Sequence, residues 1–213
     1  MLPTMLRMDD VETLVVGGGP IAARRAGKLV ATGARVVVVS PSLCDALQRM
    51  AAAGEVRWEA RPFERGDVRR RRVVVAATDS HETNAEIADA ADAEGAWINV
   101  ADDSGRSSLH FPAAVTRGRL TIAVATEGVS PAVSRRIRER VEHDYGEEFA
   151  ELLELLAAVR PDARARIATQ PGRRRFYEGV LGSEALSLLR DGRSEDARSC
   201  VADLLDAHAG DEG

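Results

Sequence analysis

A glycine cluster near the amino terminus has the composition of a phosphate-binding loop. Residues 17–22, of sequence GGGPIA, follow an apolar run at 11–16 and open a stretch with helical spacing. Glycine at 17 allows a tight turn, glycine at 19 lets the backbone approach a pyrophosphate, and alanine at 22 replaces the glycine that packs helix against strand. The alternative is a structural turn in an unrelated α/β protein. The predicted dinucleotide contacts in this loop are Gly17, Gly19, Pro20, Ile21 and Ala22.

The residue that usually distinguishes NAD from NADP is missing from this sequence. An acidic side chain at the end of the second strand normally binds the adenine ribose 2′-hydroxyl, but this chain has Ser40-Pro41-Ser42 there. Arg35 opens that strand, so it lies at the wrong end to bind a 2′-phosphate. We therefore expect NAD, with Ser40 near the ribose.

Asp102 is the candidate for acid–base chemistry. It follows the apolar run 97–100, at the carboxyl edge of a parallel sheet, where ligands of open α/β folds bind. A carboxylate positioned there could remove a proton from a substrate. Its neighbour Asp103 is less favoured, because side chains alternate along a strand. The alternative for Asp102 is a loop carboxylate that caps the turn at Ser104-Gly105.

The elements that must position these residues alternate along the first half of the chain. Apolar strands are predicted at 11–16, 35–39, 56–60, 73–77 and 97–100, with helices at 21–32, 42–53 and 82–94. This order predicts a Rossmann-type doubly wound parallel sheet. Strands at 111–116 and 120–125, joined by Arg117-Gly118-Arg119, then predict a β-hairpin.

Beyond residue 130 every periodic stretch is helical. Helices are predicted at 131–145 and 147–159, with shorter ones to about 208, a surface loop at 172–175 and a frayed end at 210–213. We therefore expect three parts in the chain. They are a dinucleotide-binding Rossmann domain at 1–108, a dimerisation hairpin and helix at 109–145, and a C-terminal helical domain at 146–213.

Composition and spacing exclude several functional classes. The net charge of −5 argues against a nucleic-acid partner, and Lys28 is the only lysine among 29 basic residues. Neither Tyr145 nor Tyr177 has a lysine four residues later, as a short-chain reductase requires, and no Walker lysine follows the glycines. Cysteines and histidines lack metal-ligand spacing, so we expect no protein-held metal. No apolar run could span a membrane or serve as a signal peptide, so we expect a cytoplasmic protein.

Four later stretches narrow the interpretation. They read AATD at 76–79, NVAD at 99–102, FPA at 111–113 and ATEGVSP at 125–131. Their order and spacing resemble the precorrin-2 dehydrogenase / sirohydrochlorin ferrochelatase family, the N-terminal module of siroheme synthase, over residues 11–143. The resemblance implies oxidation of precorrin-2 to sirohydrochlorin with NAD as hydride acceptor, in some members with ferrous iron insertion. It also implies a homodimer in which the segment after the Rossmann domain exchanges between subunits.

The resemblance also implies roles for individual residues. Asp102 would serve both dehydrogenation and chelation, and Thr78, Asp79 and Val100 would line the cofactor, although Asp79 could equally be a helix N-cap. Arginines would bind the substrate carboxylates, the candidates being Arg106, Arg117, Arg119, Arg135 and Arg136. The predicted substrate contacts are Arg106, His110, Thr126 and Ser130. For His110 the alternative is an ordinary half-buried histidine, and for Ser130 a plain helix cap before Pro131.

One rival function belongs to a different class. A non-catalytic nucleotide-sensing Rossmann module would need the glycine loop but not Asp102, the hairpin at 111–125 or the helix that begins at Ser130-Pro131. Such modules usually carry an acidic residue at the position of Ser40. The sequence therefore favours an enzyme.

Overall fold

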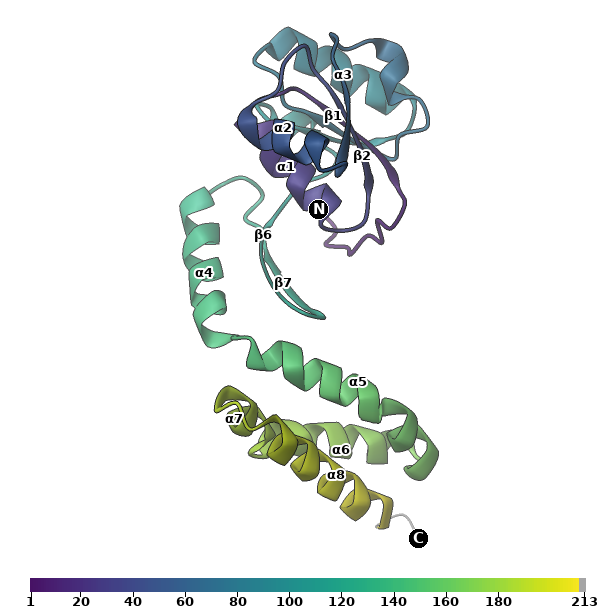
Figure 1. The fold of residues 1–213 in the computed structure, drawn as a ribbon, viewed down its shortest axis with the longest axis vertical. Coiled ribbons are helices and arrows are strands. Elements are labelled where there is room, and N and C mark those ends of the chain that lie inside the picture. The colour runs from purple at the N-terminus through teal and green to yellow at the C-terminus, as the bar shows by residue number, and fades with distance from the viewer. Residues whose placement is uncertain (211–213) are drawn as a thin grey trace. The chain divides into compact units, whose positions relative to one another are not determined.

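The computed structural model describes residues 1–210 and divides into two compact units, Met1–Phe111 and Pro112–Gly213. Figure 1 shows the chain as a ribbon with its elements labelled. Each unit is described by itself below. The predicted frayed end at 210–213 lies outside the described residues except for Gly210.

A five-stranded parallel sheet forms the centre of the first unit, in the order β3-β2-β1-β4-β5. Its strands are β1 (Glu12–Val16), β2 (Arg35–Val39), β3 (Val56–Glu59), β4 (Val73–Ala76) and β5 (Trp97–Val100). The chain places β2 and then β3 on one side of β1, and it then returns to place β4 and β5 on the other side. The carboxyl ends of β1 and β4 therefore flank the topological switch point, where open α/β sheets bind ligands. The predicted doubly wound parallel sheet is confirmed.

Helices cover both faces of this sheet, which explains why its strands are apolar at successive positions. Val15 and Val38 point toward α1 (Pro20–Val30) and α2 (Asp45–Ala52) on one face. Leu14 and Val37 point to the other face, with Ile87 of α3 (His81–Ala93) and Val68 of the 3₁₀ turn η1 (Arg65–Val68). The sheet is thereby held as a rigid base for the loops at its carboxyl edge.

Two serine side chains accept hydrogen bonds from backbone N–H groups on the free edge of β5. Ser108 Oγ accepts a hydrogen bond from Ile98 N at 2.9 Å, and Ser107 Oγ accepts one from Val100 N at 2.9 Å. Leu109 N donates to the Ile98 carbonyl at 2.9 Å. This segment follows the 3₁₀ turn η2 (Ser104–Arg106) and covers an edge that would otherwise expose unpaired backbone groups.

The second unit begins with the predicted hairpin, formed by β6 (Ala113–Arg117) and β7 (Leu120–Val124). Gly118 makes the turn with a φ of +52°, a conformation that glycine adopts at little cost. Helix α4 (Pro131–Asp144) packs against both strands. Within the described residues α4 has no buried side chain, and Val133 and Ile137 are 47% and 43% exposed.

A helical bundle completes the second unit, and it corrects two boundaries predicted from sequence. Its helices are α5 (Glu148–Arg166), α6 (Gln170–Gly182), α7 (Ala185–Arg190) and α8 (Ser194–Gly210), around the buried ring of Phe176. The predicted loop at 172–175 lies inside α6, because Thr169 caps that helix through Gly172 N and Pro171 fits its first turn. The helix predicted to end at 159 continues to Arg166, because Ala163 beyond Pro161 is buried in the bundle core.

Candidate functional site

The glycine loop is built so closely that two of its three glycines have no room for a side chain. Gly17 follows β1 with a φ of +121°, and a Cβ there would overlap the carbonyl oxygen of Ala77 at the end of the neighbouring strand. A Cβ on Gly18 would overlap the carbonyl oxygen of Ser42. The Gly18 carbonyl accepts a hydrogen bond from Cys44 N at 2.7 Å, which ties the loop to the segment before α2. The loop is therefore compressed between the ends of β4 and β2.

Gly19, in contrast, faces open space. Apart from Gly19 itself and its two chain neighbours, no described residue has an atom within 4 Å of the position of a Cβ on Gly19. Gly19 is the N-cap of α1, and no described side chain caps that helix, so its first-turn N–H groups are available to an anion. Pro20 occupies the first helical position and Ala22 is fully buried against the sheet, as the predicted packing position requires. These residues fit the pyrophosphate of a dinucleotide.

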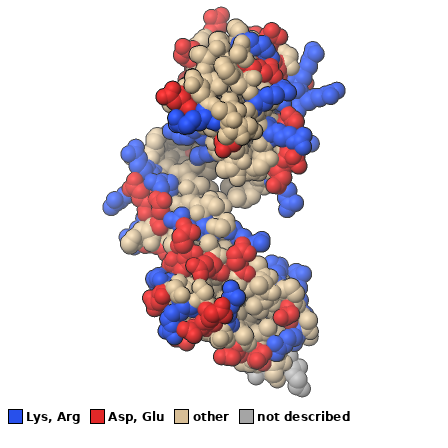
Figure 2. All heavy atoms as spheres, viewed as in Figure 1, with Lys and Arg blue, Asp and Glu red and all other residues tan. Residues whose placement is uncertain are grey.

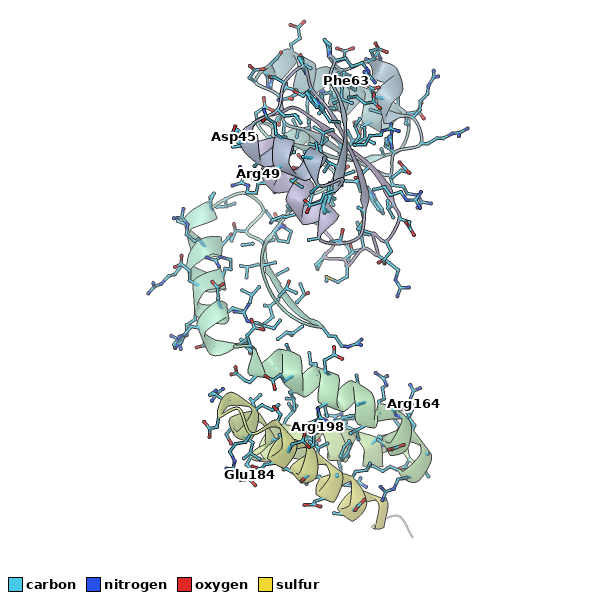
Figure 3. All side chains as sticks on the ribbon, viewed as in Figure 1. Asp45, Arg49, Phe63, Arg164, Glu184 and Arg198 are labelled. Atoms are coloured by element: carbon cyan, nitrogen blue, oxygen red, sulfur yellow. The ribbon has the colours of Figure 1, made fainter. Side chains whose placement is uncertain are left out.

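The end of β2, where an acidic residue usually binds the adenine ribose, carries a serine that is hydrogen-bonded within the chain. Ser40 is buried, and its Oγ donates to the Ser42 carbonyl at 2.8 Å. Arg35 is the first residue of β2 and pairs with Asp10 at 2.9 Å, so it lies at the amino end of the strand, as predicted. Beside the loop is a hollow of about 650 Å³ between α1 and α2 (Figure 3 labels Asp45 and Arg49). Its lining residues are Pro20, Ala23, Arg24, Cys44, Asp45, Ala46 and Arg49.

Asp102, just past β5, accepts hydrogen bonds at both carboxylate oxygens. Oδ1 accepts from Asn84 Nδ2 at 2.8 Å, and Oδ2 lies 2.8 Å from His81 Nδ1. The side chain of Asp102 keeps 38% of its surface exposed. Since each carboxylate oxygen has two lone pairs, the group can still accept a proton from a ligand. Asp102 is thus oriented but accessible.

Asn84 connects Asp102 to the end of β4. Its side chain is 1% exposed, and its Oδ1 accepts from Thr78 N at 3.0 Å and from Thr78 Oγ1 at 2.8 Å. A buried amide with its partners satisfied fixes the geometry around it. Neither Asn84 nor His81 was predicted from the sequence as a site residue. The signal that could have found Asn84 is an amide on the apolar face of the helix that follows Thr78.

These contacts shift the ionisation of Asp102. The hydrogen bond with His81 holds the pKa of Asp102 below its ordinary value, and the bond from Asn84 lowers it further, against partial desolvation. A lowered pKa favours the ionised carboxylate at neutral and mildly acidic pH. Asp102 is therefore in the state that a general base requires before it takes up a proton.

The structure rules out two capping roles that the sequence left open, one for Asp102 and one for Asp79. The turn at 104–106 is capped by Asp103, whose Oδ1 accepts from Gly105 N at 2.9 Å and Arg106 N at 3.4 Å, so the capping role considered for Asp102 is wrong. The N-cap of α3 is Ser80, whose Oγ accepts from Thr83 N at 3.1 Å, so the capping role considered for Asp79 is also wrong. Asp79 is exposed between Thr78 and Ser80.

Comparison with known proteins accounts for this combination of elements. Residues 4–113 match a family described as putative NAD(P)-binding, residues 117–143 the sirohaem biosynthesis protein central region, and residues 148–205 the sirohaem synthase dimerisation region. The chain belongs to the family of the N-terminal module of siroheme synthase. Its first unit is therefore an NAD(P)-binding domain, as predicted. The segment expected to dimerise, 109–145, overlaps the central region, and its dimerisation role stays a prediction.

Three relatives in this family are siroheme synthases from bacteria. The Methylococcus capsulatus protein is 36% identical over 211 residues, the Tolumonas auensis protein 36% over 214 and the Pseudoalteromonas translucida protein 31% over 212. These alignments cover 99%, 99% and 100% of this chain but 44%, 45% and 45% of the relatives. The chain therefore spans less than half of their length. The solved structure of SirC, precorrin-2 dehydrogenase, has the same fold, with a TM-score of 0.76 and 23% identity over 95% of this chain and 100% of its own.

The other predicted family residues in the first unit have defined surroundings. Val100 is buried at the end of β5 with its backbone N–H bonded to Ser107. Arg106 pairs with Asp89 of α3 at 2.8 Å, and His110 is exposed. Their contacts with cofactor or substrate stay predictions.

Thr126 and Ser130 lie together in the second unit. Thr126 Oγ1 donates to the Ser130 carbonyl at 3.2 Å and lies 2.9 Å from Ser134 Oγ. Ser130 is the N-cap of α4, accepting from Val133 N at 3.3 Å, so the predicted capping is confirmed. Arg117 and Arg119 pair with glutamates of the same unit at 3.2 Å and 2.7 Å. Any role of Thr126 and Ser130 toward a substrate stays a prediction.

In the described part of the chain, neither surface charge nor metal-binding side chains point to a further site. Acidic and basic side chains are intermixed on the face shown in Figure 2. No group of three or more His, Cys, Asp or Glu residues within positions 1–210 could hold a metal ion. No helix in the same range is long and apolar enough to cross a bilayer.

Proposed function

We propose that this chain is an enzyme that oxidises precorrin-2 to sirohydrochlorin with NAD as hydride acceptor. The observation that carries the proposal is the position of Asp102, whose two carboxylate oxygens are held by Asn84 and His81 at the carboxyl edge of the sheet. The same edge carries the glycine loop, with Gly19 and the first turn of α1 open to a pyrophosphate. A nucleotide-sensing module would have no use for a carboxylate prepared in this way.

The chemistry divides between the cofactor and the chain. A nicotinamide, when bound, accepts a hydride from the substrate. Asp102 would remove the proton that leaves in the same oxidation, a contribution of about 10²- to 10⁴-fold for a positioned base. Thr78 would act from the end of β4, where its hydroxyl and N–H hold Asn84 and thereby Asp102. We propose Thr78, Asp79 and Val100 as the cofactor-lining residues beside the loop.

NAD rather than NADP is part of this proposal. Ser40 presents no cation at the ribose end of the site, and Arg35 is paired at the opposite edge. Arg24 and Arg49 line the hollow beside the loop together with the carboxylate of Asp45. If NADP proves to bind more tightly than NAD, these two arginines would be its phosphate ligands and the NAD assignment would be wrong.

Turnover can be measured directly. The purified chain, incubated with precorrin-2 and NAD, should produce the absorbance of sirohydrochlorin together with that of NADH, and NADP should be used at least about tenfold less efficiently, a difference of ~1.4 kcal/mol. Parallel reactions with ferrous or cobaltous ion would separate chelation from oxidation. Omitting the dinucleotide is the control. A chain that binds NAD but yields no sirohydrochlorin would be a nucleotide-sensing module instead.

The substrate carries several carboxylates, so the chain must offer cations to it. Arg117 and Arg119 are occupied by glutamates, and Arg106 by Asp89. Arg135 and Arg136 near the start of α4 are exposed and form no ion pair with any described residue. We propose Arg135 or Arg136 as a carboxylate ligand in the second unit. The substrate contacts expected of Arg106, His110, Thr126 and Ser130 stay predictions.

We also propose that the chain is a cytoplasmic homodimer whose 109–145 segment lies in the interface. The exposed apolar side chains Val133 and Ile137 follow each other by one turn on α4. Light scattering should give twice the chain mass of 22.9 kDa for the wild type and a shift toward monomer for Ile137→Arg. Leu181→Arg on α6 changes an exposed apolar site inside residues 148–205, which match the dimerisation region, so it tests the second possible location of the interface. Dissociation by Leu181→Arg alone would place the interface in the helical bundle.

A further inference from the structure

We propose that His81 carries the proton from Asp102 to solvent, so that Asp102 is returned to its ionised form after each oxidation. This inference rests on the proposed function and adds a second residue to it. His81 contacts Asp102 rather than the reacting atoms, so it is a positioning and relay residue. Neither its position nor its spacing in the sequence suggested this role.

The geometry of His81 suits a relay. It is the first residue of α3, and the Ser80 cap before it fixes the start of the helix. Its Nδ1 lies 2.8 Å from Asp102 Oδ2, and its side chain is 71% exposed, against 38% for that of Asp102. The imidazole therefore has one nitrogen on the carboxylate while most of its surface is in water.

The second partner of Asp102 cannot do this work. Asn84 donates to Oδ1 through an amide, which does not accept a proton at neutral pH, and its side chain is buried. Of the two described side chains that hydrogen-bond Asp102, only His81 can accept a proton. The two partners thus divide their tasks, since Asn84 orients the carboxylate and His81 connects it to solvent.

The proton balance is simple. The substrate loses one hydride and one proton, and the C–H bond that gives up the proton leaves its electron pair in the macrocycle as an O–H bond forms on Asp102. The O–H bond then breaks as Nδ1 of the Nε2–H tautomer of His81 takes the proton. The resulting imidazolium releases its Nε2 proton to water. The carboxylate and a neutral Nδ1–H imidazole remain, and Nδ1 donates again to the carboxylate. Proton exchange with water returns the imidazole to the Nε2–H tautomer before the next transfer, and no further oxidant or reductant is consumed.

The energetic direction of the transfer also fits. An imidazole is ordinarily more basic than an aspartate carboxyl by about 2.6 pKa units. The hydrogen bonds of Asp102 lower its pKa further, so a proton on this carboxyl is readily lost. The other charged groups of this region are Asp79 and Glu82 beside His81 in the sequence, Asp103, and Arg106, which Asp89 neutralises. They add more negative than positive charge, which favours a cationic imidazolium intermediate.

The test separates relay from orientation. His81→Asn retains an amide donor for Asp102 but no proton acceptor, and His81→Ala removes both. We expect kcat for precorrin-2 oxidation to fall about tenfold in each variant, and the KM for NAD to stay unchanged. This fall is smaller than the loss of about 10²- to 10⁴-fold expected when a general base itself is removed. Added imidazole should restore kcat in both variants and leave the wild type unaffected. Asp92→Asn, which changes an exposed residue in the last turn of α3, is the control and should behave as the wild type.

Two outcomes would overturn the relay. Wild-type kcat in His81→Asn would mean that orientation by a donor suffices, and loss of kcat that imidazole cannot restore would mean a structural role. If the wild type itself does not oxidise precorrin-2, the proposed function fails and the relay fails with it. The ring ¹⁵N spectrum of His81 distinguishes the cases without substrate. It should show Nδ1–H in the wild type at neutral pH and lose that preference in Asp102→Asn.

Discussion

Asp102→Asn should lower kcat for precorrin-2 oxidation by about 10²- to 10⁴-fold while leaving the affinity for NAD unchanged. Asparagine has nearly the same shape as aspartate, so its side chain can still bond to Asn84 and His81, but it cannot take up a proton. Steady-state kinetics give kcat, and fluorescence titration gives the dissociation constant of NAD. A variant that loses NAD affinity would show that Asp102 serves the cofactor and not the proton transfer.

Asp103→Asn is the matched control for this prediction. Its carboxylate caps the turn at 104–106 through Gly105 and Arg106 and makes no contact with Asn84 or His81. We expect kcat to stay within about twofold of the wild type, because general-base catalysis would not involve this group. Loss of turnover in Asp103→Asn with retention in Asp102→Asn would exchange the assignments of the two residues.

Gly18→Ala should destabilise the first unit by about 3 kcal/mol, toward the upper end of overpacking effects, and abolish NAD binding. The added Cβ would overlap the Ser42 carbonyl, a backbone atom that cannot turn aside as a side chain can. Relief of the overlap must move the loop or the connection before α2. Denaturant unfolding followed by tryptophan fluorescence measures the effect, because both tryptophans of the chain, Trp58 and Trp97, lie in the first unit.

Gly19→Ala at the adjacent position is the control for packing. Its Cβ would meet no described atom within 4 Å, and the residue has a φ of −85°, which alanine readily adopts. We expect wild-type stability and NAD binding weakened about tenfold, or ~1.4 kcal/mol, because the methyl group would occupy the path of the pyrophosphate. Equal stability of the two variants would contradict the crowding of Gly18, and unchanged NAD affinity of Gly19→Ala would contradict the proposed pyrophosphate contact.

The sequence by itself determined the architecture of the first unit. Strands β2 and β5 begin and end where the apolar runs do, because a strand buried on both faces of a parallel sheet requires continuous apolar residues. The hairpin turn at Gly118 and the Ser130-Pro131 start of α4 were predicted for the same kind of local reason. Local chemistry failed inside α6, where Gly172 looks like a loop residue but is buried by packing in the bundle.

The tertiary structure alone decided how the candidate site is assembled. Asp102 bonds to residues 18 and 21 positions earlier, and no periodicity reports a polar contact over such a distance. The contact exists because β4 and β5 are neighbours in the sheet, which brings Asn84 and His81 of α3 to the end of β5. Sequence spacing identified Asp102 as a carboxylate at the sheet edge. Only the packing of α3 showed that Asn84 and His81 hold this carboxylate and lower its pKa.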